Sequence, residues 1–254
     1  VGLPRGGTPV TVYEALLERR KHARLHMTLL DPDKQSADEA GRLAAKAAES
    51  GSDAIMIGGS TGVTQAKVDR TVLAIKAAAG IPTILFPASA SNLSRHADAL
   101  YFMSLLNSRD PRLIVGEQRR AAPLVKKWAL ETIPMAYLVV EPGMRAGEVG
   151  RADPIPRSQP ETAVEYALAA QMLGMKLVYL EAGSGAPQPV PAAMIRLVRQ
   201  AIDIPLVVGG GIRTAESARD VARAGADVVV TGTIVERTKD GETLRQIIAA
   251  VKAV

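Results

Sequence analysis

Three glycine-rich segments in the C-terminal part of the chain each follow a short apolar run. Glycine lets backbone N–H groups approach an anion closely, because no Cβ stands in the way. Ser184 and Thr233 would add hydroxyl donors, and a helix that follows would add its dipole. Tight turns are the simpler alternative. Three successive segments nevertheless favour a phosphate-binding site, and they are Ala182-Gly183-Ser184-Gly185, Gly209-Gly210-Gly211 and Gly232-Thr233.

A carboxylate and a fourth glycine-rich segment indicate a cation. Asp31 ends an apolar run near the N-terminus, and Gly58-Gly59-Ser60 ends the next one. A carboxylate at such a rim is a natural Mg²⁺ ligand, and the Ser60 hydroxyl would be a second. The alternative role of Asp31 is a cap for the helix expected at 36–49, although Asp33 is closer to that helix. Thr64 is expected to cap the helix at 63–79. Two separate anion-binding segments predict two phosphorylated ligands or one long bisphosphate.

Glu181 is the expected general base. It follows Tyr179 by two residues and directly precedes a glycine-rich segment, so it is one charge in a neutral setting. The alternative is a carboxylate that pairs with Lys176 or with an arginine. His22 and His26 are four residues apart, but His26 lies in an expected strand, which argues against a helical pair of metal ligands.

The elements that must position these residues alternate between short β-branched runs and longer amphipathic stretches. Near-continuous apolar strands indicate burial on both faces, as in a parallel sheet. The alternation favours one α/β domain over residues 1–254, a TIM (β/α)₈ barrel with an N-terminal helix at 12–21, and an open doubly wound sheet is the alternative. A barrel would gather the glycine segments, Asp31 and Glu181 at its C-terminal face. The eight expected strands are 24–30, 54–57, 83–86, 99–103, 135–140, 177–181, 206–208 and 228–231.

Two connectors depart from this alternation. Residues 87–98 are barely enough for a crossover with a helix, and their serines and asparagine favour turns. We therefore expect a loop in place of the third outer helix, with a gap in the wall that a long ligand could use; a short helix at 93–98 is the alternative. Residues 141–159, rich in proline and glycine, are expected to form a functional loop over the catalytic face. Helices are expected at 36–49, 63–79, 111–130, 160–173, 191–201, 215–224 and 241–251.

Composition narrows the function classes. The chain has no cysteine, which excludes thiol nucleophiles and disulfides and fits a reducing cytoplasm. A formal charge of +5 suits anionic substrates, whereas scarce aromatic residues argue against nucleic acid. The basic cluster at 19–24 is expected to be a solvated helix end, with contact to an anionic lipid surface as the alternative. No apolar run is long enough for a transmembrane segment and no signal peptide is recognisable, so we expect a cytoplasmic protein.

Taken together, these segments resemble the geranylgeranylglyceryl phosphate synthase family from about Val12 to the C-terminus. The Asp-Pro-Asp and Tyr-Leu-Glu segments are the specific part, because many phosphate-binding barrels share the glycines. Some members have a lysine where this chain has Leu29, so the contact that this lysine makes to glycerol phosphate does not carry over. The leucine and the long connector at 141–159 resemble the branch of the family whose members often form hexamers. The matching segments are His26-Met27-Thr28-Leu29-Leu30-Asp31-Pro32-Asp33, Ala54-Ile55-Met56-Ile57-Gly58-Gly59-Ser60, Tyr179-Leu180-Glu181-Ala182-Gly183-Ser184-Gly185 and Gly209-Gly210-Gly211-Ile212-Arg213.

The resemblance implies a Mg²⁺-dependent prenyltransferase of archaeal ether-lipid synthesis that forms a homo-oligomer, a dimer or a hexamer. It would join geranylgeranyl diphosphate to the free sn-3 hydroxyl of sn-glycerol 1-phosphate and release pyrophosphate, with the prenyl tail in the wall gap. Asp31 and Ser60 would hold Mg²⁺, and Glu181 would act on the hydroxyl. The residues around glycerol phosphate would be Tyr179, Leu180, Glu181, Ala182, Gly183, Ser184, Gly185, Gly210, Gly211, Gly232 and Thr233.

The residues implied for the site could meet the physical requirements of this reaction. An allylic diphosphate ionises when a cation takes up charge on the leaving group, and the nucleophile need only be held in line. Two rival functions share the barrel: a sugar-phosphate isomerase or aldolase, and a non-catalytic phospholipid or prenyl carrier. The isomerase would have no use for Asp31, Ser60 or a wall gap. The sequence leaves the prenyl chain length open.

Overall fold

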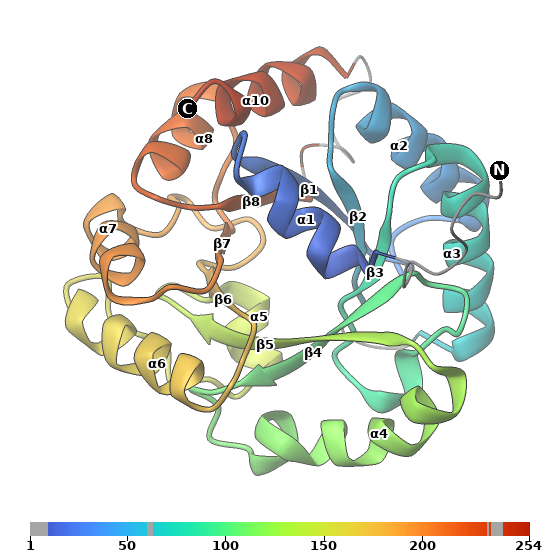
Figure 1. Cartoon of the computed structure of the whole chain (residues 1–254), viewed down its shortest axis with the longest axis horizontal. Coiled ribbons are helices and arrows are strands. Elements are labelled where there is room, and N and C mark those ends of the chain that lie inside the picture. Colours follow the sequence, from blue (N-terminus) through green and yellow to red (C-terminus); the bar gives the residue numbers. More distant parts are fainter. Residues whose placement is uncertain (1–9, 60–62, 233, 235–240) are drawn as a thin grey trace, which may run out of the picture.

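Eight parallel strands close into a barrel in the computed structural model, which describes residues 10–59, 63–232, 234 and 241–254. Each strand pairs with the next along the chain, and the last pairs with the first. The strands occupy the centre and the helices form an outer ring (Figure 1). The barrel prediction is confirmed and the open sheet was wrong. The strands are β1 (Leu25–Leu30), β2 (Ala54–Ile57), β3 (Thr83–Leu85), β4 (Ala99–Leu105), β5 (Glu131–Val139), β6 (Leu177–Glu181), β7 (Leu206–Gly209) and β8 (Val228–Thr231).

Polar residues start many of the helices. Thr11, Ser36, Thr64 and Thr214 each accept a hydrogen bond from the backbone N–H three residues further on. The expected cap at Thr64 is confirmed, whereas Ser36 caps the helix assigned to Asp33. The helical segments are α1 (Val12–Arg20), α2 (Ala37–Glu49), α3 (Gln65–Ala79), η1 (Ala90–Asn92), η2 (Arg112–Gly116), α4 (Glu117–Trp128), α5 (Met144–Val149), α6 (Pro160–Met172), α7 (Ala192–Ala201), α8 (Ala215–Arg223) and α10 (Glu242–Lys252).

Strand alternation divides the core into an inner and an outer layer. On β1, Leu25, Met27 and Leu29 pack with the side chains that fill the barrel, whereas Leu30 packs against the surrounding helices. The barrel interior is therefore a filled core, closed below the C-terminal face. None of the helices in the described part of the chain is long and apolar enough to span a membrane.

The third outer helix is missing, as the sequence predicts. Between β3 and β4 the chain forms only η1, a single 3₁₀ turn, and the alternative helix at 93–98 does not form. The Asp98 carboxylate fixes the connector directly to the strand before it, because it accepts hydrogen bonds from the Thr83 backbone N–H at 2.9 Å and from the Thr83 hydroxyl at 2.7 Å. These hydrogen bonds hold the connector against β3 where no outer helix packs.

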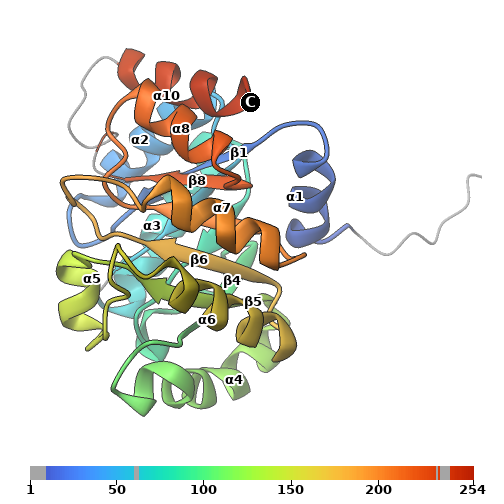
Figure 2. The same ribbon diagram turned by 90° about the vertical axis from the view of Figure 1, so that its left-hand side faces the viewer.

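The connector after β5 is more ordered than the sequence suggests. It contains the helix α5, and its backbone pairs with neighbouring segments through bridges between Val140 and Ile155 and between Ser108 and Ala152. Figure 2 places α5 at one end of the barrel and α1 at the opposite end. The connector therefore covers the C-terminal face, as predicted, but with a helix where a loop was expected.

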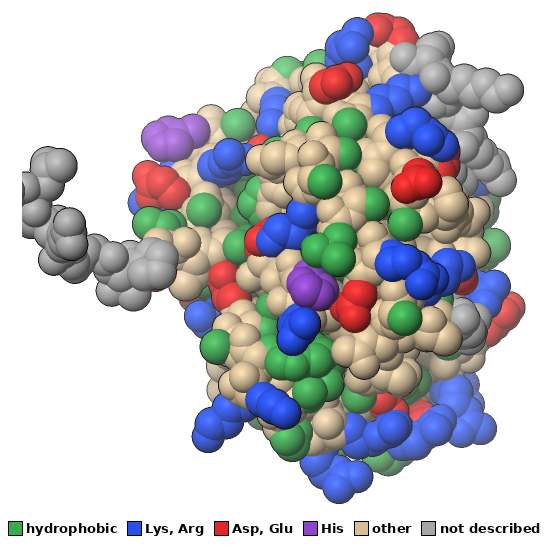
Figure 3. Space-filling model, turned by 90° about the vertical axis from the view of Figure 1, so that its right-hand side faces the viewer, with side chains coloured by type: hydrophobic (Ala, Val, Ile, Leu, Met, Phe, Trp, Pro, Cys, Tyr) green, Lys and Arg blue, Asp and Glu red, His purple; other side chains and the backbone are tan. Residues whose placement is uncertain are grey.

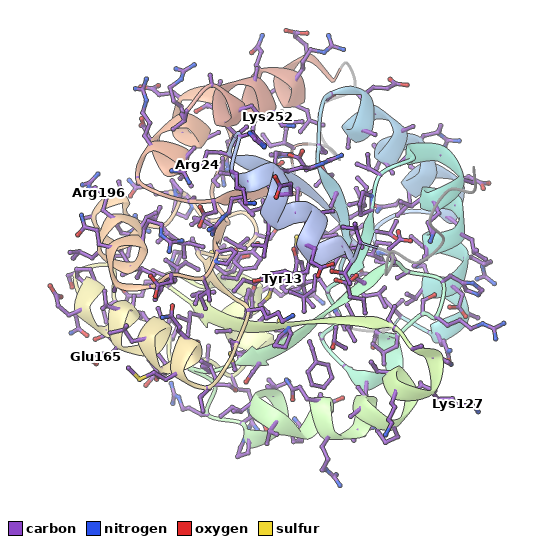
Figure 4. The ribbon with its side chains drawn as sticks, in the orientation of Figure 1. Tyr13, Arg24, Lys127, Glu165, Arg196 and Lys252 are labelled. Carbon is purple, nitrogen blue, oxygen red and sulfur yellow. The ribbon has the colours of Figure 1, made fainter. Side chains whose placement is uncertain are left out.

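The helix α1 closes the N-terminal end of the barrel. The backbone N–H groups of Val12 and Tyr13 donate to the Glu131 carboxylate at 2.7 and 2.8 Å. The Tyr13 hydroxyl donates to the Lys176 carbonyl at 2.9 Å, and the Lys176 ammonium lies 4.8 Å from the centre of the Tyr13 ring. Figure 4 shows Tyr13 over the middle of this end of the barrel.

The basic cluster at 19–24 also holds the N-terminal end together. Arg19 lies 3.4 Å from the Asp53 carboxylate. Arg20 and Arg24 contact the buried Asp227 carboxylate at 3.3 and 2.9 Å (Arg24 is labelled in Figure 4). These pairs join the first helix and strand to the starts of β2 and β8, so the arginines of the cluster have a structural role.

A buried chain of polar side chains lies on the outer face of β1. The His26 ring places Nδ1 2.9 Å from the Ser52 hydroxyl and Nε2 2.9 Å from the Thr231 hydroxyl, and Ser52 lies 2.7 Å from the Thr28 hydroxyl. Burial, with a smaller contribution from nearby Lys252, lowers the pKa of His26 to about 3, so the ring is neutral. His22 is exposed just after the end of α1. Both His26 ring nitrogens therefore have hydroxyl partners within the protein.

The neutral His26 makes stability depend on pH. Its pKa falls from 6.5 to about 3 on folding, so its contribution is complete above pH 6.5 and is lost as pH falls towards 3. Between pH 7 and pH 5 we expect the wild type to lose about 2 kcal/mol more unfolding free energy than His26→Gln. Denaturant unfolding at each pH measures this. The exposed His22→Gln should keep the wild-type slope, and a wild-type slope in His26→Gln would contradict the prediction.

Candidate active site

Two adjoining cavities open at the C-terminal face of the barrel. The larger has a volume of about 610 Å³ and the smaller about 360 Å³. Both lie at the ends of strands, where loops from different strands meet. The residues that line both cavities are Leu29, Asp31, Lys34, Glu181 and Ser184. Three of the predicted site residues, Asp31, Glu181 and Ser184, are therefore brought together at the junction.

The smaller cavity is built from the glycine-rich ends of β6, β7 and β8. Gly210 and Gly211 have φ angles of +83° and +73°, which favour glycine. A Cβ on Gly210 would collide with the Glu181 carboxylate, and one on Gly211 would collide with the backbone of Gln188. The two glycines thus let the β6 and β7 loops approach each other. The predicted residues that line this cavity are Tyr179, Glu181, Ser184, Gly185, Gly210, Gly211 and Gly232.

Other predicted residues of this segment lie elsewhere. Leu180 and Ala182 are buried in the core between sheet and helices, because they alternate with the inward-facing residues of β6. Gly183 contributes its backbone N–H to Glu181 rather than to the cavity wall. Ser60 and Thr233 lie outside the described residues. The side chains of Leu180 and Ala182 therefore face the core, and their contact with a ligand stays a prediction.

Arg213, just past the β7 glycines, locks the loops around the smaller cavity. Its guanidinium donates to the Gly185 carbonyl at 2.7 Å and to the Ala186 carbonyl at 2.9 Å. The β6 loop is therefore held to the segment that follows β7. Sequence reasoning quoted this arginine but gave it no role, because its partners are backbone carbonyls that carry no sequence signal.

Glu181 is a buried carboxylate with three hydrogen-bond donors. The Gly183 backbone N–H lies 2.6 Å from Oε1, and the Tyr137 and Tyr179 hydroxyls also donate to the carboxylate. Burial raises the pKa of Glu181, and these donors offset part of the rise. The Lys176 ammonium lies instead over the Tyr13 ring at the other end of the barrel. The proposed pairing with Lys176 is therefore wrong, and the environment suits a general base.

An aromatic cluster separates Glu181 from the barrel core. The Tyr137 and Tyr179 ring centres are 5.2 Å apart, and Phe86 lies 5.3 Å and 5.8 Å from them. Burial, then the Glu181 charge, raises the pKa of both tyrosines well above 10, so both remain hydrogen-bond donors. Sequence reasoning missed Tyr137. Tyr137 meets Tyr179 through the β5–β6 register, which no local sequence pattern shows.

The larger cavity occupies the gap left by the missing third helix. Its floor and walls are mostly apolar, and its rim carries the basic residues Arg112, Arg120 and Arg145. Glu117 on α4 closes one side, because its carboxylate accepts hydrogen bonds from the Ala90 backbone N–H at 2.8 Å. Basic side chains gather over α4, at the lower edge of Figure 3. The apolar lining residues include Phe86, Leu93, Leu100, Phe102, Met103, Leu105, Leu113 and Val149.

Asp31 is the carboxylate at the end of β1. Its side chain is 22% exposed, and Oδ2 lies 2.7 Å from the Lys34 ammonium. A Cβ on Gly58, at the end of β2, would collide with Oδ1, so that glycine makes room for the carboxylate. The described residues contain no cluster of three carboxylates or histidines around a metal position. One carboxylate facing a phosphate-sized cavity still fits Mg²⁺, which is often held by one or two carboxylates and substrate phosphates.

Comparisons with known proteins agree with this geometry. The PcrB family model matches residues 16–252. The chain is 56% identical to the geranylgeranylglyceryl phosphate synthase of Thermococcus gammatolerans over 90% of this chain and 91% of the relative. It is 55% identical to the synthase of Thermococcus kodakarensis over 94% of each chain. A crystal structure of the Thermoplasma acidophilum (S)-3-O-geranylgeranylglyceryl phosphate synthase with its substrate sn-glycerol-1-phosphate aligns with a TM-score of 0.93 at 47% identity, covering 96% of this chain and 99% of that one.

Two glycines with the same φ angle test the close approach at Glu181. Gly185 and Gly210 both have φ of +83°, but an added Cβ meets nothing within 4 Å at Gly185 and strikes Glu181 at Gly210. Gly185→Ala should therefore lose about 1 kcal/mol of unfolding free energy through backbone strain alone. Gly210→Ala should lose about 1–3 kcal/mol more, because of the collision. Equal losses in thermal or denaturant unfolding would show that Gly210 is not needed for space.

Proposed function

The chain belongs to the PcrB family and to the geranylgeranylglyceryl phosphate synthases, and we propose that it joins geranylgeranyl diphosphate to the free sn-3 hydroxyl of sn-glycerol 1-phosphate. The products are geranylgeranylglyceryl phosphate and pyrophosphate. The observation that carries this proposal is the pair of adjoining cavities that share Asp31 and Glu181. One cavity is glycine-lined and suits a small phosphate, and the other is apolar and suits a long hydrocarbon.

In this proposal, sn-glycerol 1-phosphate binds in the smaller cavity. Its phosphate accepts hydrogen bonds around Gly211 and Gly232, and its glycerol hydroxyls extend towards the junction. The Thermoplasma acidophilum relative was solved in complex with sn-glycerol-1-phosphate, which supports this compound as the ligand. The prenyl tail lies in the larger cavity, so that its diphosphate reaches the junction as well. The two reacting carbon and oxygen atoms then meet beside Glu181.

Glu181 acts as the general base in the transfer. The C1–O bond of the allylic diphosphate breaks, and its electron pair leaves with pyrophosphate. The sn-3 hydroxyl oxygen bonds to C1, and its proton passes to the Glu181 carboxylate. Tyr137 and Tyr179 hold that carboxylate in place through their hydroxyls. The raised pKa of Glu181 makes it a stronger base than an exposed glutamate.

Mg²⁺ belongs to the proposal at Asp31. Asp31, with Ser60, would hold the ion together with the diphosphate oxygens, in the manner of Mg²⁺ at phosphate substrates. When bound, it supplies positive charge to the leaving group. A cytoplasmic location and a homo-oligomeric assembly, a dimer or a hexamer, remain predictions of the same proposal.

Pyrophosphate release tests the proposed function directly. The purified chain is mixed with sn-glycerol 1-phosphate, geranylgeranyl diphosphate and Mg²⁺, and pyrophosphate and the ether product are both measured. Release that needs all three components supports the proposal. Binding of a sugar phosphate with isomerisation and no pyrophosphate would favour the isomerase, and binding of the prenyl compound without turnover would favour a carrier. Repeating the assay with longer prenyl diphosphates measures the chain-length preference.

The Glu181→Gln variant tests the general base. The change keeps the shape but removes the proton acceptor, so turnover should fall about 10²–10⁴-fold while both substrates still bind. Melting temperature at pH 8 should not fall, because a carboxylate whose pKa is raised on folding costs stability once it is ionised. Wild-type activity should rise with pH through a pKa above 4.5. The exposed Glu165→Gln on α6 is the control (Figure 4), and Glu181→Gln turnover within a few-fold of wild type would contradict the assignment.

The Asp31→Asn variant tests the cation site. Losing a charged metal ligand should reduce turnover by about a hundredfold, which corresponds to about 3 kcal/mol of transition-state stabilisation. The affinity for sn-glycerol 1-phosphate should remain, since the phosphate lies at the ends of β6 to β8. Calorimetric titration and Mg²⁺-dependent rates measure the two effects. Asp38→Asn, an exposed change on α2, is the control, and near-normal Mg²⁺-dependent turnover in Asp31→Asn would contradict the metal assignment.

A further inference from the structure

Residues 31–34 form a tight turn that places a cation over a carboxylate. The Lys34 backbone N–H donates to the Asp31 carbonyl at 3.1 Å, and Pro32 occupies the second position, where a turn favours proline. The turn brings the Lys34 ammonium to 2.7 Å from Asp31 Oδ2. The Lys34 side chain is 41% exposed, so the ammonium remains accessible from the cavities. The local sequence therefore fixes this ion pair at the end of β1.

Lys34 holds a special position among the cations of the site. Arg112, Arg120 and Arg145 line only the larger cavity, and Arg213 lines only the smaller one. Of the lysines and arginines that the structure describes in the two linings, Lys34 alone faces both. It therefore lies where the bond to the leaving group would break.

We propose that Lys34 is a catalytic residue that pairs with Asp31 in the free enzyme and with the departing pyrophosphate during the reaction. This inference rests on the proposed prenyl transfer. As the C1–O bond breaks, its electron pair adds negative charge to the leaving oxygen, and the ammonium offsets that charge. The new C–O bond forms at C1, the proton goes to Glu181, and Lys34 stays protonated throughout. Lysine binds phosphate as a compact point charge.

If Lys34 moves from Asp31 to pyrophosphate, removal of its ammonium should change the affinities for a divalent cation and for pyrophosphate in opposite directions. The ammonium and a divalent cation compete for the Asp31 carboxylate in the free protein. Without the ammonium, Lys34 no longer offsets the negative charge of the Asp31 carboxylate, so a divalent cation should bind there more tightly. Pyrophosphate, in contrast, loses a positive partner, so its binding should weaken. A purely structural lysine would alter the melting temperature and neither affinity.

The experiment compares Lys34→Met, which keeps an unbranched side chain and removes the ammonium, with Lys34→Arg, which keeps the charge. Lys127→Met, an exposed change on α4, is the matched control (Lys127 is labelled in Figure 4). Mn²⁺ binding to the free proteins is followed by electron paramagnetic resonance, and inorganic pyrophosphate binding by calorimetry. Single-turnover rates are measured at saturating substrates and Mg²⁺, together with melting temperatures.

We expect Lys34→Met to bind Mn²⁺ several-fold more tightly, to bind pyrophosphate about tenfold more weakly and to turn over about a hundredfold more slowly. Lys34→Arg should recover pyrophosphate binding, and Lys127→Met should match the wild type. Pyrophosphate affinity equal to wild type in Lys34→Met, or weaker Mn²⁺ binding, would overturn the inference. The Mn²⁺ and pyrophosphate titrations need no turnover, so a wild type that fails to make product would overturn the proposed function separately.

Discussion

The active site depends on a carboxylate buried at the mouth of a closed barrel. Removing Glu181 from water is unfavourable unless its oxygens find donors, and two tyrosine hydroxyls and one backbone N–H meet that requirement. The glycines of β7 follow from the same constraint. A Cβ on Gly209 would collide with the Tyr179 hydroxyl, and one on Gly210 would collide with Glu181. Glycines that suggest an anion site thus also make space for the Tyr179 and Glu181 side chains.

The two ends of the barrel divide stability and chemistry between them. At the N-terminal end, Asp227 gathers Arg20, Arg24 and Arg199, and its carboxylate also accepts the Leu206 backbone N–H at 2.8 Å. A buried carboxylate with so many partners holds elements together and leaves no group free to react. At the C-terminal end, Asp31 pairs with Lys34 at 2.7 Å and lines both cavities. An accessible charge therefore lies at the end of the barrel that carries the two cavities.

The gap left by the missing third helix shows how much of the site could be predicted from local sequence. The short connector with its serines predicted the missing helix, and eight apolar runs predicted the barrel, because strand length and turn chemistry are local properties. Asp31, Glu181 and the glycine ends could be placed on one face for the same reason, since parallel strands end on one side. The helix in the connector after β5 was missed, because glycine and proline there mask a six-residue helix, α5.

What the sequence determined by itself was the order of elements and the strand end at which each reactive residue lies. The tertiary structure alone decided which of those residues meet. The β5–β6 register brings Tyr137 beside Glu181, and the approach of two loops brings the Gln188 backbone against Gly211. Barrel closure places Lys34 between two cavities. These contacts join residues far apart in the chain, and a distance across a barrel depends on register and packing that no local pattern encodes.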